Sequence, residues 1–281
     1  MNALYLGVIV LTLSMQNITK KGYTQKSSGG VYTFSVLTCL SAALFFVMTS
    51  KGLQWEKGVV PYALAFATAY CITTVFSVLA IGCGSLSLTN LMISYSLMIP
   101  AVYGVVWLED KLGDFFYPGI VMLVCSLFLI NEQSEKTKIR FKWIIYVTLA
   151  AVGNGMCSVF QKMQQVKFNE QYKSELMIIA LVSGAIGLTI VALVQERKEI
   201  IPCVKTGWIY AVLGGVCNGI VNLFVMILSG KMEASLMFPT ISAGGIVVTY
   251  IISKYFYKES LTKRQFVGFV LGIVSVVLLN L

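Results

Sequence analysis

Long stretches without a charged side chain dominate this sequence and limit what it can fold into. Asp, Glu, Lys and Arg are absent from 2–19, 27–50, 58–108, 115–131, 143–161, 176–195, 206–230, 234–253 and 265–281. A helix needs about 20 predominantly apolar residues to cross a bilayer. The segment 58–108 is long enough for two such helices and divides at Gly82-Cys83-Gly84-Ser85. The sequence therefore predicts an all-α integral membrane protein with ten transmembrane helices.

The predicted spans fill the chain and leave no room for a soluble domain. They are 2–20, 30–50, 59–81, 85–108, 115–131, 142–162, 175–195, 207–229, 233–256 and 264–281. The chain is 57% hydrophobic and 12% charged, whereas a soluble domain is about half apolar and about a quarter charged. A cytoplasmic enzyme, a DNA-binding protein and a secreted disulfide scaffold are excluded. We expect a multi-pass protein of the plasma (inner) membrane, with the lipid bilayer as partner.

Charge and reactive residues narrow the function further. The net charge of +9 comes from Lys and Arg in short loops, where they set membrane orientation, so we expect no nucleic-acid partner. The seven cysteines lack ligand spacing and histidine is absent, so we expect no disulfide framework, metal or cofactor. Motifs of membrane-embedded or serine enzymes are also absent. We therefore expect that the protein is not an enzyme.

A shift of 149 residues reveals an internal repeat. The residues Asp110, Leu112, Gly119, Val121, Ser126, Leu129 and Asn131 align without gaps on Glu259, Leu261, Gly268, Val270, Ser275, Leu278 and Asn280. The sequence therefore predicts one five-helix repeat over 1–131, a charged linker loop over 132–141 and a second repeat over 142–281. Because five is odd, the second copy must cross the membrane in the opposite sense. Such inverted repeats are a recurring construction of secondary transporters, with the substrate site at the repeat interface.

A family resemblance follows from the acid-x-Leu pattern before the fifth and tenth spans. The stretch from Phe238-Pro239 through Phe256-Tyr257-Lys258-Glu259-Ser260-Leu261-Thr262 to Gly268 resembles the closing signature of EamA-like permeases of the drug/metabolite transporter superfamily. The resemblance implies a permease for small metabolites, with a cavity lined by the first, third, fourth, sixth, eighth and ninth spans. Asn90 stands where the second repeat has Pro239. With Gly244-Gly245, Pro239 predicts a hinge in the ninth span, and the fourth span need not break at the matching place.

Polar side chains within the spans supply the candidate substrate-binding residues. In the sixth span Asn154, Ser158 and Gln161 recur at i, i+4 and i+7, and in the eighth Asn218 and Asn222 lie four residues apart, so each set occupies one helix face. Amides and hydroxyls both donate and accept, which suits a polar or zwitterionic solute. The full predicted site consists of Gln16, Tyr70, Thr73, Asn90, Tyr95, Asn154, Ser158, Gln161, Lys162, Asn218 and Asn222.

Each of these predictions has an alternative. The polar side chains could instead bind one another between packed helices. Lys162 could snorkel to the interface, or it could face the cavity and attract a carboxylate or phosphate, and Lys20 occupies the matching position in the first repeat. Gly268-x-x-x-Gly272 predicts close helix packing or a dimer contact, so we expect a monomer or a homodimer.

The sequence leads to a secondary transporter, an exporter or facilitator, for a small polar metabolite such as an amino acid or organic anion. A multidrug exporter of lipophilic compounds is the alternative, although no Asp or Glu lies in the middle of a span to pair with a drug cation. A structural or sensory membrane protein does not need polar side chains on the inward-facing surfaces of its helices. The excess of basic residues after the first, fifth, seventh and ninth spans predicts both termini outside, whereas the resemblance implies both inside.

Overall fold

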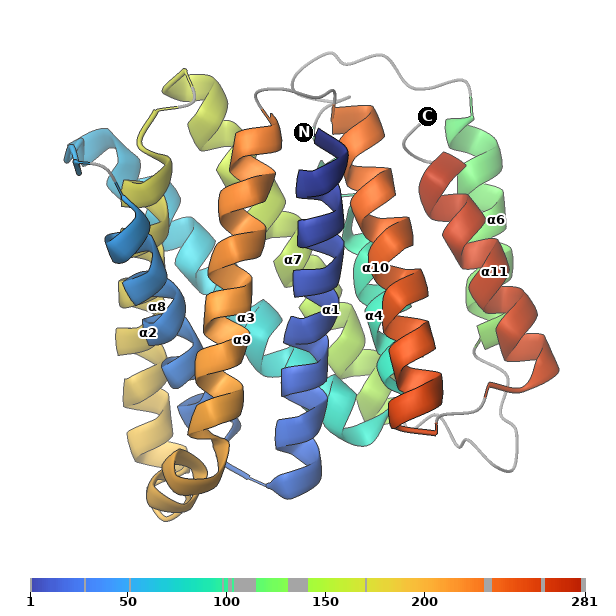
Figure 1. Ribbon diagram of the computed structural model, residues 1–281, viewed down its shortest axis with the longest axis horizontal. Helices are drawn as coiled ribbons and strands as arrows, with labels where there is room; N and C mark the ends of the chain where they lie inside the picture. The colour runs from blue at the N-terminus through green and yellow to red at the C-terminus, as the bar shows by residue number, and fades with distance from the viewer. Residues whose placement is uncertain are drawn as a thin grey trace.

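The computed structural model describes residues 2–27, 29–50, 52–97, 99–100, 103, 115–130, 141–169, 171–229, 234–258 and 261–278. All regular secondary structure within these residues is helical (Figure 1). The α-helices are α1 (Asn2–Lys26), α2 (Val31–Thr49), α3 (Val60–Cys83), α4 (Leu86–Ser94), α6 (Phe116–Ile130), α7 (Phe141–Lys167), α8 (Lys173–Gln195), α9 (Ile200–Ser229), α10 (Ala234–Phe256) and α11 (Lys263–Leu278). Two short 3-10 helices, η1 (Lys57–Val59) and η2 (Tyr95–Leu97), precede α3 and follow α4.

Several helices are long and apolar enough to cross a membrane. Five segments of the described chain meet this condition, namely Val31–Thr49, Lys57–Cys83, Phe141–Lys167, Lys173–Gln195 and Ile200–Leu228. Their outer faces expose large apolar side chains such as Leu44, Ile186 and Val194, which is favourable in lipid and costly in water. The protein is thus an all-α membrane protein. The other predicted spans fall on α1, α4, α6, α10 and α11 or on undescribed residues, and the count of ten stays a prediction.

Helix packing follows the same plan in the two halves of the chain. The helix α1 packs against α9 and α10, while α7 packs against α3 and α4; likewise α2 contacts α9 and α8 contacts α3. Each contact is reproduced when α1 to α4 are exchanged with α7 to α10. The start of α1 and the end of α11 lie toward the same edge of the bundle (Figure 1).

Contacts around Gly84 fix the relative directions of α1 and α7. The ammonium of Lys21, near the end of α1, donates to the carbonyl oxygen of Gly84 at 3.2 Å. A side chain at Gly84 would collide with the indole of Trp143, near the start of α7. The end of α1 and the start of α7 therefore lie at one edge, and the two helices run in opposite directions.

The interruption of the helix lies in the fourth span and not in the ninth, where a hinge stays a prediction. The helix α10 continues without interruption from Ala234 to Phe256, through Pro239 and Gly244-Gly245. In contrast, α4 ends at Ser94 and tightens into η2. Pro100 explains this position, because a proline has no N–H for the carbonyl four residues earlier, and that carbonyl belongs to Ser96. Pro239 also lacks an N–H, but the carbonyl four residues earlier belongs to Ser235 in the first turn of α10. The missing hydrogen bond therefore lies at the start of the helix and does not interrupt it.

Trp143 lies close to the start of α7, but its side chain is buried inside the protein instead of facing the membrane interface. Its side chain is 3% exposed, and its Nε1–H donates to the hydroxyl of Thr89 at 2.9 Å. This bond joins α7 to α4 and satisfies the polar indole atom inside the protein.

Glycines allow the helix backbones to approach closely. A Cβ on Gly215 of α9 would lie 2.5 Å from the carbonyl oxygen of Thr38 of α2, and one on Gly219 would collide with the Phe45 ring. In the GxxxG motif of α11, the carbonyl of Gly268 accepts a hydrogen bond from Ser126 of α6 at 2.7 Å. Both motifs therefore serve packing within the chain, as in other membrane helices.

Substitution Gly215→Val is expected to destabilise the bundle, whereas Gly187→Val on α8 is the matched control. A Cβ at Gly215 overlaps the backbone of α2, while one at Gly187 meets nothing within 4 Å. Overpacking typically costs about 1–3 kcal/mol, so the unfolding temperature in detergent should fall by roughly 2–10 °C for Gly215→Val. Equal unfolding temperatures for the two variants would contradict this packing.

Candidate functional site

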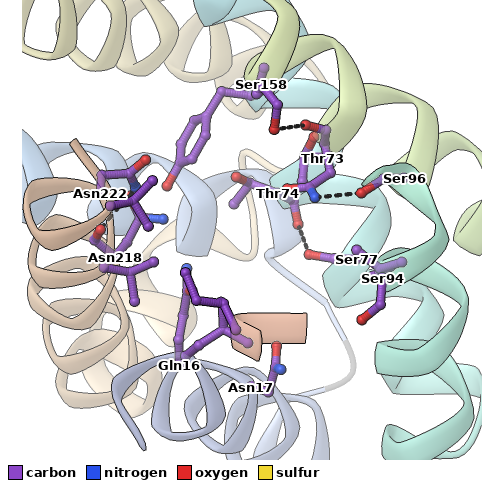
Figure 2. Close-up of a pocket in the computed structure, with 18 of the residues that line it drawn as sticks. Gln16, Asn17, Thr73, Thr74, Ser77, Ser94, Ser96, Ser158, Asn218 and Asn222 are labelled. Carbon is purple, nitrogen blue, oxygen red and sulfur yellow. Dashed lines mark hydrogen bonds between the residues drawn. The ribbon is translucent and has the colours of Figure 1, made fainter. Parts of the chain in front are cut away.

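A cavity of about 200 Å³ lies between helices of both halves of the chain. Side chains of α1, α3, α4, α7, α9 and α10, together with Ser96 of η2, line it. Figure 2 shows labelled amides and hydroxyls from five of these helices and η2 arranged around this space. These six helices correspond to the spans that the family resemblance implies. The cavity is therefore built from equivalent helices of the two halves.

Helical periodicity explains how each helix presents its side chains to the cavity. The helix α1 contributes Leu13, Gln16, Asn17 and Lys20 at i, i+3, i+4 and i+7. The same spacing recurs in α7 with Asn154, Cys157, Ser158 and Gln161, and in α9 with Asn218, Val221, Asn222 and Val225. Residues at this spacing lie on one helix face. Each helix thus places a mixed stripe of amide, hydroxyl and apolar groups against the cavity.

Most of the predicted site residues meet in this cavity. The residues that line it are Gln16, Tyr70, Thr73, Asn90, Asn154, Ser158, Gln161, Asn218 and Asn222. Tyr95 and Lys162 are not in the lining. Lys162 is half-buried on α7, and its position follows Gln161 by one residue, which rotates the side chain by about 100° around the helix.

Tyr95 instead connects η2 to helices outside the cavity. Its hydroxyl lies 2.7 Å from the hydroxyl of Ser126 on α6. Since Ser126 donates to the carbonyl of Gly268, Tyr95 is the donor in this pair. Tyr95 therefore holds the irregular end of α4 against α6 and α11.

Hydrogen bonds between lining side chains join α1, α4, α7 and η2. The amide of Asn17 donates to Oδ1 of Asn90 at 2.7 Å, and the amide of Asn154 donates to the hydroxyl of Ser96 at 2.7 Å. A polar group without a partner is costly in a medium that lacks water. The polar stripes therefore serve helix packing and line the cavity at the same time, so the two interpretations of the sequence are compatible.

A chain of amides joins α7 to α9. Gln161 Nε2 donates to Oδ1 of Asn222 at 3.2 Å, and Asn222 Nδ2 donates to the carbonyl and Oδ1 of Asn218 at 2.9 and 3.2 Å. The acceptor oxygens of Asn222 and Asn218 are therefore occupied within the protein. The chain ends at the side-chain NH₂ of Asn218, which borders the cavity.

Lys20 is a lining residue that the predicted site omits. Its side chain is 9% exposed, and its Nζ donates to the hydroxyl of Ser77 on α3 at 3.0 Å. The sequence contained a signal for it, because Lys20 follows Gln16 by four residues on the same face of α1. Asn17, Thr74, Ser77, Ser94, Ser96 and Ser242 are further polar lining residues outside the predicted site.

Two buried donors in the lining have no hydrogen-bond partner. They are the hydroxyl of Tyr70 and the Nδ2 of Asn90. Buried polar atoms in proteins are almost always paired. Both atoms are buried behind the surface of the cavity wall, so a solute in the cavity does not reach them in this conformation.

The lining also has an apolar part. Leu13, Phe66, Ile93, Val221 and Ile241 supply hydrophobic surface between the polar stripes. No cluster of three or more His, Cys, Asp or Glu side chains occurs in the described part of the chain. The arrangement is suited to binding a small solute through hydrogen bonds and apolar contacts.

Solved structures resemble this chain in fold. One of them, described only as a crystal structure of a protein, aligns with a TM-score of 0.70 over 99% of this chain and 95% of its own length, at 11% sequence identity. At this identity the likeness concerns the fold alone. No curated protein matches the sequence.

The second half of the chain matches a protein family. Residues 141–281, from the start of α7 to the last residue, match the model of the EamA-like transporter family. The match covers half of the chain and includes the region from Phe238 to Gly268 on which the resemblance was based. The predicted membership is thereby confirmed. The chain belongs to the EamA-like transporter family, whose members move solutes across membranes and are not enzymes.

Proposed function

We propose that the protein is a secondary transporter that moves a small polar metabolite, such as an amino acid or organic anion, across the plasma membrane by alternating access. The observation that carries this proposal is the cavity between equivalent helices of the two halves, into which both halves place amide and hydroxyl side chains. A substrate site at the interface of two repeats is a recurring feature of secondary transporters.

The arrangement of the helices supports two inverted repeats. The contacts of α1 with α9 and α10 recur as contacts of α7 with α3 and α4, and the contacts of Gly84 place the end of α1 beside the start of α7. Two halves of similar structure and opposite direction can exchange their conformations. In such an exchange the cavity would open to one side of the membrane while it closes to the other, which is the essence of alternating access.

The size and chemistry of the cavity support a small polar solute. A space of about 200 Å³ lined by amides and hydroxyls offers both donors and acceptors. Its apolar part also fits the second candidate, a multidrug exporter of lipophilic compounds. Lys20 disfavours the binding of a cationic drug, because it is the one charged side chain among the described lining residues and its charge is positive.

Transport itself is tested with the purified chain in liposomes. We expect saturable flux for at least one solute from a panel of amino acids, carboxylates, phosphate esters and sugars. Tetraphenylphosphonium represents the lipophilic cations of the second candidate. Flux of this cation without flux of any polar metabolite would favour the multidrug exporter, and an absence of any saturable flux would contradict transport of small metabolites.

Gln161→Leu and Asn218→Leu are expected to reduce the flux of the transported solute. The first substitution removes the donor to Asn222, and the second removes its acceptor side chain. An unpaired buried polar group costs about 1–3 kcal/mol, so the loss should be at least about fivefold. Thr68→Leu on the exposed face of α3 is the matched control. Unchanged flux in both cavity variants, with normal folding, would mean that these amides serve packing alone.

Inverted repeats predict opposite sidedness for two equivalent loops. Gln25 at the end of α1 and Gln171 between α7 and α8 are both exposed, and each can be replaced by cysteine in a chain that lacks the seven native cysteines. A membrane-impermeant maleimide should label Gln25→Cys and Gln171→Cys from different sides. Both should react after the membrane is permeabilised. Labelling of both from the same side would contradict the inversion.

A further inference from the structure

Lys20 is a buried cationic side chain in the lining of the cavity. We infer that the cavity binds solutes bearing a carboxylate or phosphate group, and that Lys20 on α1 holds this anionic group. The inference rests on the proposed transport function and names the substrate class for the same cavity.

The first observation is a buried positive charge without a negative partner. Lys20 is 9% exposed and lines the cavity. Asp and Glu are absent from the described lining residues. A buried charge is stable only when it is paired or well hydrogen-bonded, because its desolvation costs several kcal/mol. An anionic solute would supply the missing partner.

The second observation is that the protein uses only part of the donor capacity of Lys20. Its ammonium has three N–H groups, and the hydroxyl of Ser77 accepts one of them at 3.0 Å. Ser77 itself donates to the carbonyl of Thr74 at 3.0 Å. This bond turns an oxygen lone pair of Ser77 toward Lys20 and fixes the ammonium against α3. The other N–H groups of Lys20 donate to no acceptor in the described part of the chain.

The free N–H groups of Lys20 favour a solute rich in lone pairs. An ionised carboxylate or phosphate offers only acceptor oxygens, and hydrogen bonds to charged oxygens are stronger than neutral ones.

The two halves of the cavity divide the recognition between them. The pair between Lys20 and Ser77 joins α1 to α3, and the pair between Gln161 and Asn222 joins the equivalent helices α7 and α9. Lys162, which aligns with Lys20 in the repeat, is not part of the lining. Only the first half therefore contributes a charge. The anionic group is bound on the side of α1 and α3, and the neutral part of the solute faces the amides of α7 and α9.

Matched pairs of probes test the charge preference of the wild-type chain. The probes are lactate with lactamide, succinate with succinamide, and glycerol phosphate with glycerol, with tetraphenylphosphonium as the cation. Binding is measured from the rise in unfolding temperature with probe concentration, and flux is measured in liposomes. We expect the anionic member of at least one pair to bind at least about tenfold more tightly than its neutral partner, a difference that corresponds to one favourable charge interaction.

Variants of Lys20 identify the residue responsible. Lys20→Met should abolish the preference, so that the anionic and neutral members of each pair bind with similar affinity. Lys20→Arg should keep the preference, because a guanidinium remains charged. Lys26→Met changes the net charge equally at an exposed position of the same helix and should behave as wild type. If Lys20→Met does not fold, the comparison of wild type with Lys20→Arg and the probe pairs still measures the sign of the preference.

The outcomes separate this inference from the proposed function. Equal or tighter binding and flux of the neutral probes or of tetraphenylphosphonium would leave transport intact and overturn the anion preference. An anion preference that persists in Lys20→Met would overturn the assignment of the anion site to Lys20. If neither these probes nor the wider metabolite panel binds or moves, the proposed function and the inference fail together.

Discussion

The need to pair polar groups where water is absent governs this structure. Amides, hydroxyls and the ammonium of Lys20 lie within helices whose outer faces are apolar. Many of the hydroxyls bond to a carbonyl of their own helix, whereas several amides and Lys20 find partners on a neighbouring element. Each such bond is favourable because the unpaired alternative in hydrocarbon is costly. The bond between Asn17 and Asn90 fixes α1 against α4, and the bond between Asn154 and Ser96 fixes α7 against η2. The groups that hold the helices together thereby also form the wall of the cavity.

Close backbone approach makes these bonds possible. A Cβ on Gly153 of α7 would lie 2.8 Å from the carbonyl oxygen of Ala69 on α3, and one on Gly155 would lie 2.8 Å from the carbonyl oxygen of Ser96. A larger side chain at either position would move α7 outward, beyond the reach of Asn154 to Ser96. Small residues and polar residues therefore act together: the glycines set the distance between helices, and the amides make use of it.

Helical periodicity made most of the site predictable from the sequence. Asn154, Ser158 and Gln161 share a face because their spacing matches the helix, and all three line the cavity. Lys162 shows the limit of such reasoning. It follows Gln161 by one residue and therefore lies on a different face of α7, and the sequence alone does not tell which face of the helix lines the cavity. Tyr95 lies outside the cavity for another reason. Periodicity applies only within a regular helix, and α4 becomes a 3-10 turn at Tyr95, a break that Pro100 signals but that Pro239 made us expect elsewhere.

The two halves have similar helix packing but place different side chains in the cavity, so the two sides of the cavity differ in chemistry. Two identical halves would present the same groups to both ends of a bound solute. Here the contact between α1 and α3 places an ammonium beside a hydroxyl, while the equivalent contact between α7 and α9 places amide beside amide. A metabolite with one charged and one neutral end matches such a wall in one orientation only. In the transport cycle that we propose, the solute keeps its contacts with both halves while the helices around it change which end of the cavity is open, because its binding depends on side chains within each half.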